Sequence, residues 1–519
     1  MSKHDPVDVV IVGAGAAGGV AAYQLADAGF KVVVLEAGPF WEPRKDWSSD
    51  ELATENQAWR EKRLTAGQNP LKLAKNNSGW GVGGGTVHFN GVALRFRESD
   101  FRMYSEDGVG VDWPIAYEDL APYYDKIEHE VAVSGPKDWP WPPARPPYPY
   151  PARNPLSGPA MLFQLGCHKL GVTSVPAPLF ILSAPFEGRP ACINRGFCVQ
   201  GCMVDAKFST LITYIPKAIK LGAEVRPYCM VSRINTGADG KVTGVTYIDQ
   251  DGQEHEQPAR VVLLAAFAIE TPRLLLMSAS SQFPHGLANG SGMVGKRLMT
   301  HLSQDVWARF DQEVRPYKGT PVLATTQDFY ATDKANDYAR GFTIHAHGFR
   351  PVAFGRGIAV PNQVWGPAFQ ELLRDYNYYA KLTTVGEVLP YDENRVELSD
   401  ETDRFGLPAP KVTFSYGENE KRMAQGGIRR MKAIMEAAGG KPLYEGDDTA
   451  HLMGGCVMGN DPSTSVVDSY GQAHEVPNLF ITGAPIFPTS TGNNPTLTVM
   501  ALAARTADRI VELAERREI

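Results

Sequence analysis

The chain begins with an alternation of apolar and small-residue stretches that is typical of a βαβ unit. Residues 7–12 form a short apolar run, and only glycine and alanine occupy positions 13–19. A helical stretch of small residues follows at 20–28, and a second apolar run at 31–35 ends at Glu36. Strand, tight turn, helix and strand in this order predict a nucleotide-binding unit at the start of an α/β fold.

Three glycines in the first turn have the spacing of a dinucleotide-binding fingerprint. Gly13 permits the tight turn, Gly15 lets the backbone approach a pyrophosphate, and Gly18 lets the helix pack closely on the strand. The N-terminus of that helix then faces the phosphates with its free N–H groups. Glu36 stands at the end of the second strand, where a carboxylate can accept hydrogen bonds from an adenosine ribose.

The rest of the pattern contains more strands than one βαβ unit needs. The predicted segments are a β-meander at 224–262, a helix from Ile269 with Pro272 near its start, mixed strands at 305–416, a buried strand at 478–482 and a helix at 495–513. This distribution favours a second domain built on a sheet.

Length and charge exclude some classes of protein. The chain has 519 residues, too many for one small module, and 51 Lys plus Arg against 58 Asp plus Glu give a net charge of −7. No basic stripe stands out, which argues against nucleic acid as a partner. No stretch approaches the roughly 20 apolar residues of a membrane span. The N-terminus has no apolar export segment, so we expect a cytoplasmic protein.

A second glycine-rich segment at 81–91 reads Gly-Val-Gly-Gly-Gly-Thr-Val-His-Phe-Asn-Gly. Its glycine content excludes a helix or a regular strand, and we expect a loop whose backbone comes close to a flat or charged group.

Together these segments resemble the glucose-methanol-choline (GMC) family of FAD-dependent oxidoreductases. The resemblance covers nearly the whole chain, and within the family it is greatest to bacterial sugar dehydrogenase large subunits, of the fructose and gluconate dehydrogenase type, and to pyranose or glycoside oxidases. Besides the fingerprint and the glycine-rich loop, it rests on Tyr117-Glu118-Asp119-Leu120, Thr271-Pro272-Arg273-Leu274-Leu275, Asn394-Arg395-Val396, the segment 451–459 (His-Leu-Met-Gly-Gly-Cys-Val-Met-Gly) and Asn494-Pro495-Thr496-Leu497-Thr498.

The resemblance implies a two-domain α/β flavoprotein. A Rossmann-like FAD domain is expected from residues 1–110, 190–310 and 440–519, and a sheet-based substrate domain from 111–189 and 311–439. It also implies FAD rather than NAD. The expected FAD contacts are Gly13, Gly15, Gly18, Glu36, Gly84, Gly85, His88, Asn90, Gly91, Gly483, Pro495 and Thr496.

The start of the last helix has a direct physical interpretation. We expect Asn494 as its N-cap and Pro495 as its first residue, so that free N–H groups and the positive end of the helix dipole point forward. In the family this end lies near the flavin, where it would stabilise the negative charge that develops during hydride transfer.

His451 and Asn494 are the expected catalytic pair. A neutral imidazole is a suitable base near pH 7, whereas an amide can only orient the hydroxyl group, so we assign the base to His451. His88 lies where related sugar oxidases bind FAD covalently through a histidine, and covalent and noncovalent FAD both stay open. His301 and His474 have no recognisable partner pattern.

Three cysteines, Cys192, Cys198 and Cys202, have the spacing that holds a 3Fe–4S cluster in several flavin sugar dehydrogenases. Those proteins have a double cysteine at the first position, where this chain has Cys192-Ile193. Basic Arg195 and Lys207 nearby would favour thiolates. A cluster and a metal-free cysteine loop are the two alternatives, and the missing neighbour slightly favours the second.

The function expected from the resemblance is oxidation of a sugar or glycoside hydroxyl to a ketone or lactone by hydride transfer to flavin N5. Electrons then pass to O2, a quinone or another acceptor. The alternative is the large subunit of a membrane-associated sugar dehydrogenase, which has a small subunit, uses a cluster and a cytochrome, and is exported with its partner to the periplasm. A non-redox lyase in which FAD is structural is a further rival.

Overall fold

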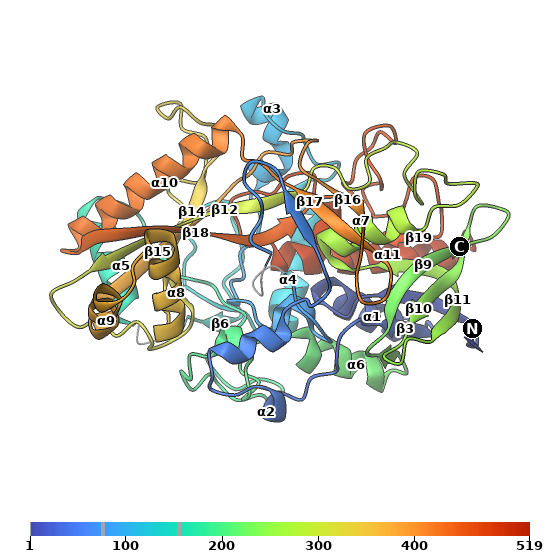
Figure 1. Ribbon diagram of the computed structural model, residues 1–519, viewed down its shortest axis with the longest axis horizontal. Helices are drawn as coiled ribbons and strands as arrows, with labels where there is room; N and C mark the ends of the chain where they lie inside the picture. Colours follow the sequence, from blue (N-terminus) through green and yellow to red (C-terminus); the bar gives the residue numbers. More distant parts are fainter. Residues whose placement is uncertain (1, 74–77, 153–156) are drawn as a thin grey trace.

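The computed structural model describes residues 2–73, 78–152 and 157–519, and two large β-sheets with surrounding helices form its framework (Figure 1). The predicted α/β class is confirmed. None of the helices in the described ranges is both long and apolar enough to span a bilayer.

The first sheet contains the predicted βαβ unit, in which helix α1 (Ala16–Asp27) connects β2 to the parallel strand β3. The strand order is β8-β3-β2-β11-β10-β9, and β1 and β19 also pair with β11. Strands β2 and β3 are almost wholly apolar because neighbouring elements cover both of their faces. Its strands are β1 (Ser2–Lys3), β2 (Val7–Val12), β3 (Val32–Leu35), β8 (Glu224–Arg226), β9 (Met230–Thr236), β10 (Val242–Ile248), β11 (Glu254–Leu264) and β19 (Leu479–Ile481).

Two details of this region differ from the sequence-based expectation. Only β9, β10 and β11 form an antiparallel meander, because β8 leaves it to pair in parallel with β3 at the far edge of the sheet. Helix α7 (Phe267–Met277) begins soon after β11 ends, which puts Pro272 inside the helix and not in its first turn.

The second sheet has six strands in the order β18-β12-β15-β14-β13-β7. Its strands are β7 (Val175–Pro176), β12 (Met299–Arg309), β13 (Val322–Thr326), β14 (Phe342–His347), β15 (Tyr379–Gly386) and β18 (Lys441–Met453). Apolar residues such as Val306 and Leu382 share a core with helices α5 (Gly158–Lys169) and α10 (Glu418–Ala437). The alternate residues on these strands point to the other face, which borders a cavity.

The domain boundaries predicted from the sequence stay a prediction. The pairing of strands groups some segments of the chain differently from those boundaries. Strands β12 and β18 belong to the second sheet, although residues 299–309 and 441–453 were assigned to the FAD domain. Helix α4 (Tyr117–Val131), which the sequence predicts in the substrate domain, packs in the hydrophobic core of the first domain. Apolar patterning alone does not specify which of two sheets a strand joins, because strand pairing depends on residues far apart in the sequence.

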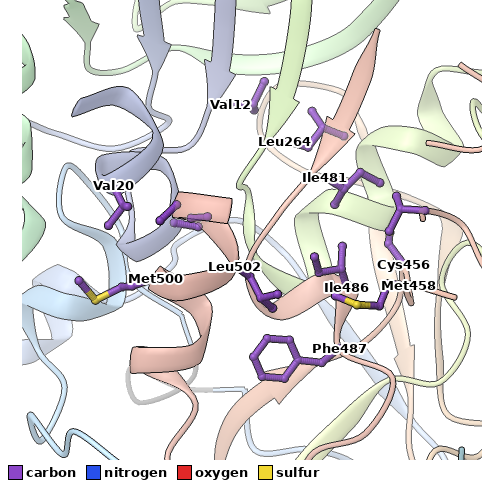
Figure 2. Packing of buried hydrophobic residues seen from close by; sticks show 14 of the residues in the cluster. Val12, Val20, Leu264, Cys456, Met458, Ile481, Ile486, Phe487, Met500 and Leu502 are labelled. Atoms are coloured by element: carbon purple, nitrogen blue, oxygen red, sulfur yellow. The ribbon is translucent and has the colours of Figure 1, made fainter. Parts of the chain in front are cut away.

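The core of the first domain lies where the parallel strands end. Figure 2 shows Val12, Leu264 and Ile481 in succession, while Leu502 of helix α11 (Thr496–Glu515) lies beside Ile486. Because Val12 is opposite Leu264 and Leu264 opposite Ile481, the chain leaves β2, β11 and β19 at one edge of the sheet. In open α/β sheets, ligands bind outside the carboxyl ends of such strands.

The remaining elements connect or cover these sheets. They include α2 (Pro43–Asp46), α3 (Met103–Asp107), α6 (Tyr214–Lys220), α8 (Pro351–Asn362), α9 (Pro367–Arg374), the two-stranded sheet of β5 (Ser134–Gly135) with β6 (Tyr150–Pro151), and the three-stranded sheet of β4 (Leu64–Ala66), β16 (Arg395–Thr402) and β17 (Pro408–Thr413).

Candidate active site

A cavity of about 930 Å³ extends from the carboxyl end of the first sheet to the inner face of the second. Most of the residues predicted from the sequence line it, namely Gly13, Gly15, Glu36, Gly84, Gly85, His88, Asn90, Gly483, Pro495, Thr496, His451 and Asn494. Two of the predicted FAD contacts, Gly18 and Gly91, are not among its lining residues. One cavity therefore joins the predicted cofactor residues to the predicted catalytic pair.

The three fingerprint glycines have different physical reasons to be glycine. Gly13 has a φ of 99°, and a Cβ there would lie 2.6 Å from the carbonyl oxygen of Ala265. A Cβ on Gly18 would overlap the carbonyl oxygen of Gly13. At Gly15 the nearest atom to such a Cβ is the Cα of Gly84, at 3.8 Å, and the position faces the cavity. The protein itself has room for a side chain at Gly15, so the space is left for a bound group.

The second glycine-rich segment supplies another such position. It forms a short 3-10 turn, Gly84–Val87, and a Cβ on Gly85 would meet no atom of the described residues within 4 Å although Gly85 borders the cavity. Gly84 has a φ of 50°, and a Cβ on it would lie 2.7 Å from the Cα of Gly15. The turns that carry Gly15 and Gly85 therefore approach each other closely. They leave between them a space that an extended ligand fits, which we call the cradle.

Glu36 has a role that the sequence did not indicate. Its buried carboxylate accepts hydrogen bonds from the backbone N–H groups of Ala14, Gly38 and Gly81, at 2.9, 3.0 and 3.2 Å. Burial raises the pKa of Glu36, and these N–H groups oppose that shift by stabilising the carboxylate. Glu36 thus fixes three turns around the cavity and also lines it.

Lys207 holds the backbone that carries His88. Its fully buried ammonium group donates to the carbonyl oxygens of Thr86, Val87 and Phe89 at 3.0, 3.0 and 3.3 Å. Burial lowers its pKa to about 8. As the sequence predicted, the charge of Lys207 acts to lower the pKa of Cys198, although burial raises that pKa more strongly. The three hydrogen bonds of its ammonium group go to the loop that carries His88.

A β-bulge aims His451 at the cavity. Met299 pairs with Met453 and His301 with Ala450, so two residues of β18, His451 and Leu452, are opposite one residue of β12. His451 has a φ of 61°, in the left-handed region that residues with a side chain rarely adopt. Such strained conformations concentrate at active sites, where surrounding contacts enforce them.

The hydrogen bonds of His301 assign the proton positions on His451. His301 Nε2 lies 3.0 Å from the carbonyl oxygen of Ser490, which can only accept, so Nε2 carries the proton. The other nitrogen of neutral His301, Nδ1, must then accept from His451 Nδ1–H at 2.8 Å. The lone pair of His451 is therefore on Nε2, the nitrogen that lies 3.4 Å from Asn494 Nδ2.

Asn494 is placed by a second histidine. His345 Nε2 donates to Asn494 Oδ1 at 3.0 Å, so the amide directs its NH2 group towards His451. The expectation that Asn494 caps the last helix is wrong. Helix α11 begins at Thr496 with Pro495 at the N-cap position, and no side chain caps it, because the Asn494 amide is occupied by the two histidines.

Burial keeps this group of histidines neutral. Desolvation lowers the pKa of His301 and of His345 to about 4. It also lowers the pKa of His451 well below its usual value, with further lowering by His301 and His345. A neutral imidazole with an exposed lone pair is the form that a general base requires.

The geometry around the three cysteines of the predicted cluster favours the metal-free alternative. Within 2–73, 78–152 and 157–519, no three His, Cys, Asp or Glu side chains are grouped closely enough to bind a metal ion. Cys198 is buried and Cys192 and Cys202 are partly buried, all as free thiols. Burial raises the pKa of Cys198 to about 12, which opposes the thiolate that a cluster needs.

Sequence reasoning found His451 and Asn494 but missed the histidines that position them. His301 is 150 residues from His451, and its partners are set by strand pairing that no local motif encodes. His345 and His347 could have been recognised from the sequence, because two histidines at alternate positions of a strand must lie on one face.

Comparison with known proteins identifies the family of this chain. A family model described as GMC oxidoreductase matches residues 7–303, and a second one with the same description matches residues 390–503. The 2-methyl-1,2-propanediol dehydrogenase of Mycolicibacterium austroafricanum is 34% identical over 98% of this chain and 96% of its own. The fructose dehydrogenase large subunit of Gluconobacter japonicus is 32% identical over 97% of each chain.

The fold is also similar to that of a solved structure. An Aspergillus oryzae formate oxidase variant superimposes with a TM-score of 0.72 over the whole of both chains, at 16% sequence identity. At that identity the similarity concerns the fold alone, and it confirms the two-domain architecture.

Proposed function

Since the chain belongs to the GMC oxidoreductases, enzymes that act on CH–OH groups, we propose that it binds FAD and oxidises a hydroxyl group of a sugar or glycoside to a ketone or lactone. The observation that carries this proposal is the hydrogen-bond chain Ser490–His301–His451, which presents the lone pair of His451 Nε2 beside Asn494 in the cavity.

The cradle between the two glycine-rich turns supports FAD as the cofactor. Gly15 and Gly85 both leave space that no atom of the described residues fills, and a pyrophosphate would occupy the space at Gly15. The N-terminus of helix α11, with Pro495 and Thr496 at the cavity wall, would face the flavin with its free N–H groups. When bound, FAD supplies the hydride acceptor for oxidation of the alcohol.

The side chains of the site orient the substrate and accept its proton. His451 Nε2 accepts the proton of the substrate hydroxyl group, and the amide NH2 of Asn494 donates to the hydroxyl oxygen and orients it. As His451 becomes charged, its Nδ1–H keeps its hydrogen bond to His301 Nδ1. His301 in turn is held by the Ser490 carbonyl group, so the ring of His451 keeps its orientation while its charge changes.

A sugar or glycoside is favoured over a simple alcohol by the polar side chains that the second sheet contributes to the cavity, among them Asp305, Lys381 and Thr383. The fructose dehydrogenase relative acts on a sugar by its name, and the propanediol dehydrogenase on a small diol. Screening neutral sugars, glycosides and small alcohols for anaerobic bleaching of the flavin tests the proposal. Absence of bleaching by every compound would instead favour the lyase, in which FAD is structural.

The His451→Ala variant tests the base itself. It should retain FAD, because the cradle lies elsewhere, and should slow flavin reduction by about 10² to 10⁴-fold. His474→Ala is a matched control, since His474 hydrogen-bonds to Ser465 and does not line the cavity. An unchanged reduction rate in the His451 variant would remove this residue from the mechanism.

For the electron acceptor, the cysteines favour O2 or a small quinone over a cytochrome reached through a 3Fe–4S cluster. Without a cluster the protein needs no small subunit and can act alone in the cytoplasm. Iron analysis of anaerobically prepared protein discriminates the two branches. About three irons per chain would overturn this choice, whereas peroxide released on sugar addition without iron would support it.

The attachment of FAD is tested at His88, which is buried and lines the cavity. Acid denaturation followed by gel filtration separates the alternatives. Flavin that stays with the wild-type chain and is released from His88→Ala supports a covalent bond, and release from the wild type excludes it.

A further inference from the structure

The cavity-facing side of the second sheet carries two rows of side chains that the proton transfer does not use. Asp305 of β12 pairs with Thr383 of β15, which pairs with His345 of β14. In the neighbouring row, Trp307 pairs with Lys381. All five residues line the cavity. Because adjacent strands lie about 4.8 Å apart, Asp305 is roughly 10 Å from the histidine that holds Asn494.

The rows contain a buried charged pair that can form further hydrogen bonds. Asp305 accepts from Thr383 Oγ1 at 2.5 Å through one carboxylate oxygen and from Lys381 Nζ at 2.8 Å through the other. A carboxylate has about four acceptor positions and an ammonium group three donors. The pair can therefore bind a further donor at Asp305 and a further acceptor at Lys381, which is the combination that a hydroxylated ligand offers.

Two buried polar atoms of the same face have no hydrogen-bond partner among the described residues. They are Nε1 of Trp307, an indole donor, and Nδ1 of His345. His345 donates through Nε2, so its neutral ring leaves an acceptor lone pair on Nδ1. Both side chains are at least 98% buried. Buried polar groups are normally satisfied, so these atoms indicate a polar ligand in the cavity.

We propose that Asp305, Thr383, Lys381 and Trp307 form a subsite that binds the hydroxyl groups of a neutral sugar other than the one oxidised. The proposal deepens the function proposed above and rests on it. The subsite offers two donors and an acceptor, while Nδ1 of His345 adds an acceptor nearer the reaction centre. A ligand that reaches both ends must extend over two strand spacings, which suits a sugar ring better than a three-carbon alcohol.

Charge selects neutral sugars over amino sugars and sugar acids. The carboxylate of Asp305 and the ammonium group of Lys381 are in direct contact, so the pair presents no net charge to the ligand. A cationic amino sugar or an anionic sugar acid would therefore lose its hydration in the cavity without an opposite net charge to compensate for it, which disfavours both.

The test uses the FAD-loaded enzyme and two readouts. Stopped-flow bleaching gives the dissociation constant and the limiting reduction rate for D-fructose, D-glucose, methyl β-D-glucoside and 1,2-propanediol. Ligand-observed NMR measures binding of the same sugars without any need for turnover. The variants are Asp305→Asn, Thr383→Val and the double variant Asp305→Asn with Lys381→Met, which removes both charges together and leaves neither one buried alone.

Two exposed ion-pair residues supply controls, namely Asp311→Asn and Lys432→Met. We expect the subsite variants to weaken sugar binding about tenfold or more, to change the limiting reduction rate little and to leave 1,2-propanediol unaffected. The controls should behave like the wild type.

The outcomes separate this proposal from the function on which it rests. Equal losses for sugars and 1,2-propanediol, or unchanged sugar binding in every variant, would overturn the subsite while alcohol oxidation stands. If no compound bleaches the flavin, oxidation itself fails, and NMR then decides the subsite alone. Sugar binding that Asp305→Asn weakens would support it, and binding that does not depend on Asp305, or no binding, would refute it.

Discussion

His301 illustrates how much of the site depends on single atoms. Because the Ser490 carbonyl group fixes the proton on Nε2 of His301, Nδ1 is an acceptor and determines which nitrogen of His451 can act as the base. His301 touches no substrate in this arrangement and is a positioning residue. Its contribution depends on its hydrogen-bonding pattern and not on its bulk.

This pattern predicts different effects for two substitutions of His301. His301→Leu keeps the volume but cannot accept from His451, and we expect flavin reduction to slow at least about tenfold, because the other tautomer of His451 becomes accessible. His301→Gln, which can donate to Ser490 and accept from His451, should recover part of the rate. Stopped-flow reduction across the pH range checks both variants.

Equal rates for the leucine and glutamine variants would show that His301 only fills space. A structural defect common to both would instead appear in thermal unfolding, which is measured alongside.

At the residue scale the sequence predicted the atoms that react better than the atoms that position them. His451 and Asn494 lie in local motifs whose chemistry can be interpreted directly. His301 and Ser490 meet only because β12 and the segment before helix α11 come together in the fold. No spacing along the chain contains that information.

Among the elements, the two glycine-rich turns carry the cofactor cradle, and the glycines within them should respond differently to substitution. Gly15→Val should abolish FAD retention and leave the stability of the apoprotein nearly unchanged, because no atom of the described residues lies nearer than 3.8 Å to the new Cβ. Gly18→Ala should destabilise the protein even without FAD, because its Cβ would overlap the backbone of Gly13.

Absorbance after gel filtration reports FAD retention, and thermal unfolding of the apoproteins reports stability. If Gly15→Val retained full flavin absorbance, the cradle would have to lie elsewhere.

The loop that carries His88 depends on one cation from a distant segment. Lys207→Met would leave three buried carbonyl groups without their donor, so we expect a loss of a few kcal/mol in the free energy of unfolding and weaker FAD retention. Chemical denaturation with and without FAD measures both effects. Lys217→Met, which removes an exposed ion pair with Glu187, is the matched control and should change little.

Element types were predictable where periodicity was strong, as in the βαβ unit and the last helix. The bulge that aims His451 was not predictable, because it arises from the register between β12 and β18. The capping role expected of Asn494 failed for a related reason. Asparagine often caps helices, but the amide of Asn494 is instead hydrogen-bonded to two histidines of the second sheet.

For the whole molecule, the hydrophobic pattern predicted an α/β protein with a second, sheet-based domain, and the domain boundaries expected from the resemblance stay a prediction. Strands β12 and β18 both contain apolar and polar residues, and neither sequence encodes the sheet that the strand joins. Their place in the second sheet puts His301 and His451 at the boundary between the cofactor cradle and the polar sheet face. The global pairing of strands therefore decides where the chemistry occurs.

Keeping His301 and His345 neutral at this boundary makes the stability of the whole protein depend on pH. Both have a pKa of about 4 in the folded state against 6.5 for an unperturbed histidine. Well above pH 6.5 both histidines are neutral in the folded and in the unfolded protein, so they add no pH dependence to the free energy of unfolding. As the pH falls from 6.5 to 4, the unfolded chain binds protons that the folded protein does not, so the free energy of unfolding decreases.

The shift of both groups corresponds to roughly 3 kcal/mol each over this interval. Urea denaturation at pH 7, 6 and 5 should therefore show a steep loss of stability, and the double variant His301→Gln with His345→Gln should lose less between pH 7 and 5 than the wild type. His168→Gln, at an exposed helix position, should keep the wild-type slope. An identical slope in the double variant would mean that these two histidines are not the groups that link proton binding to folding.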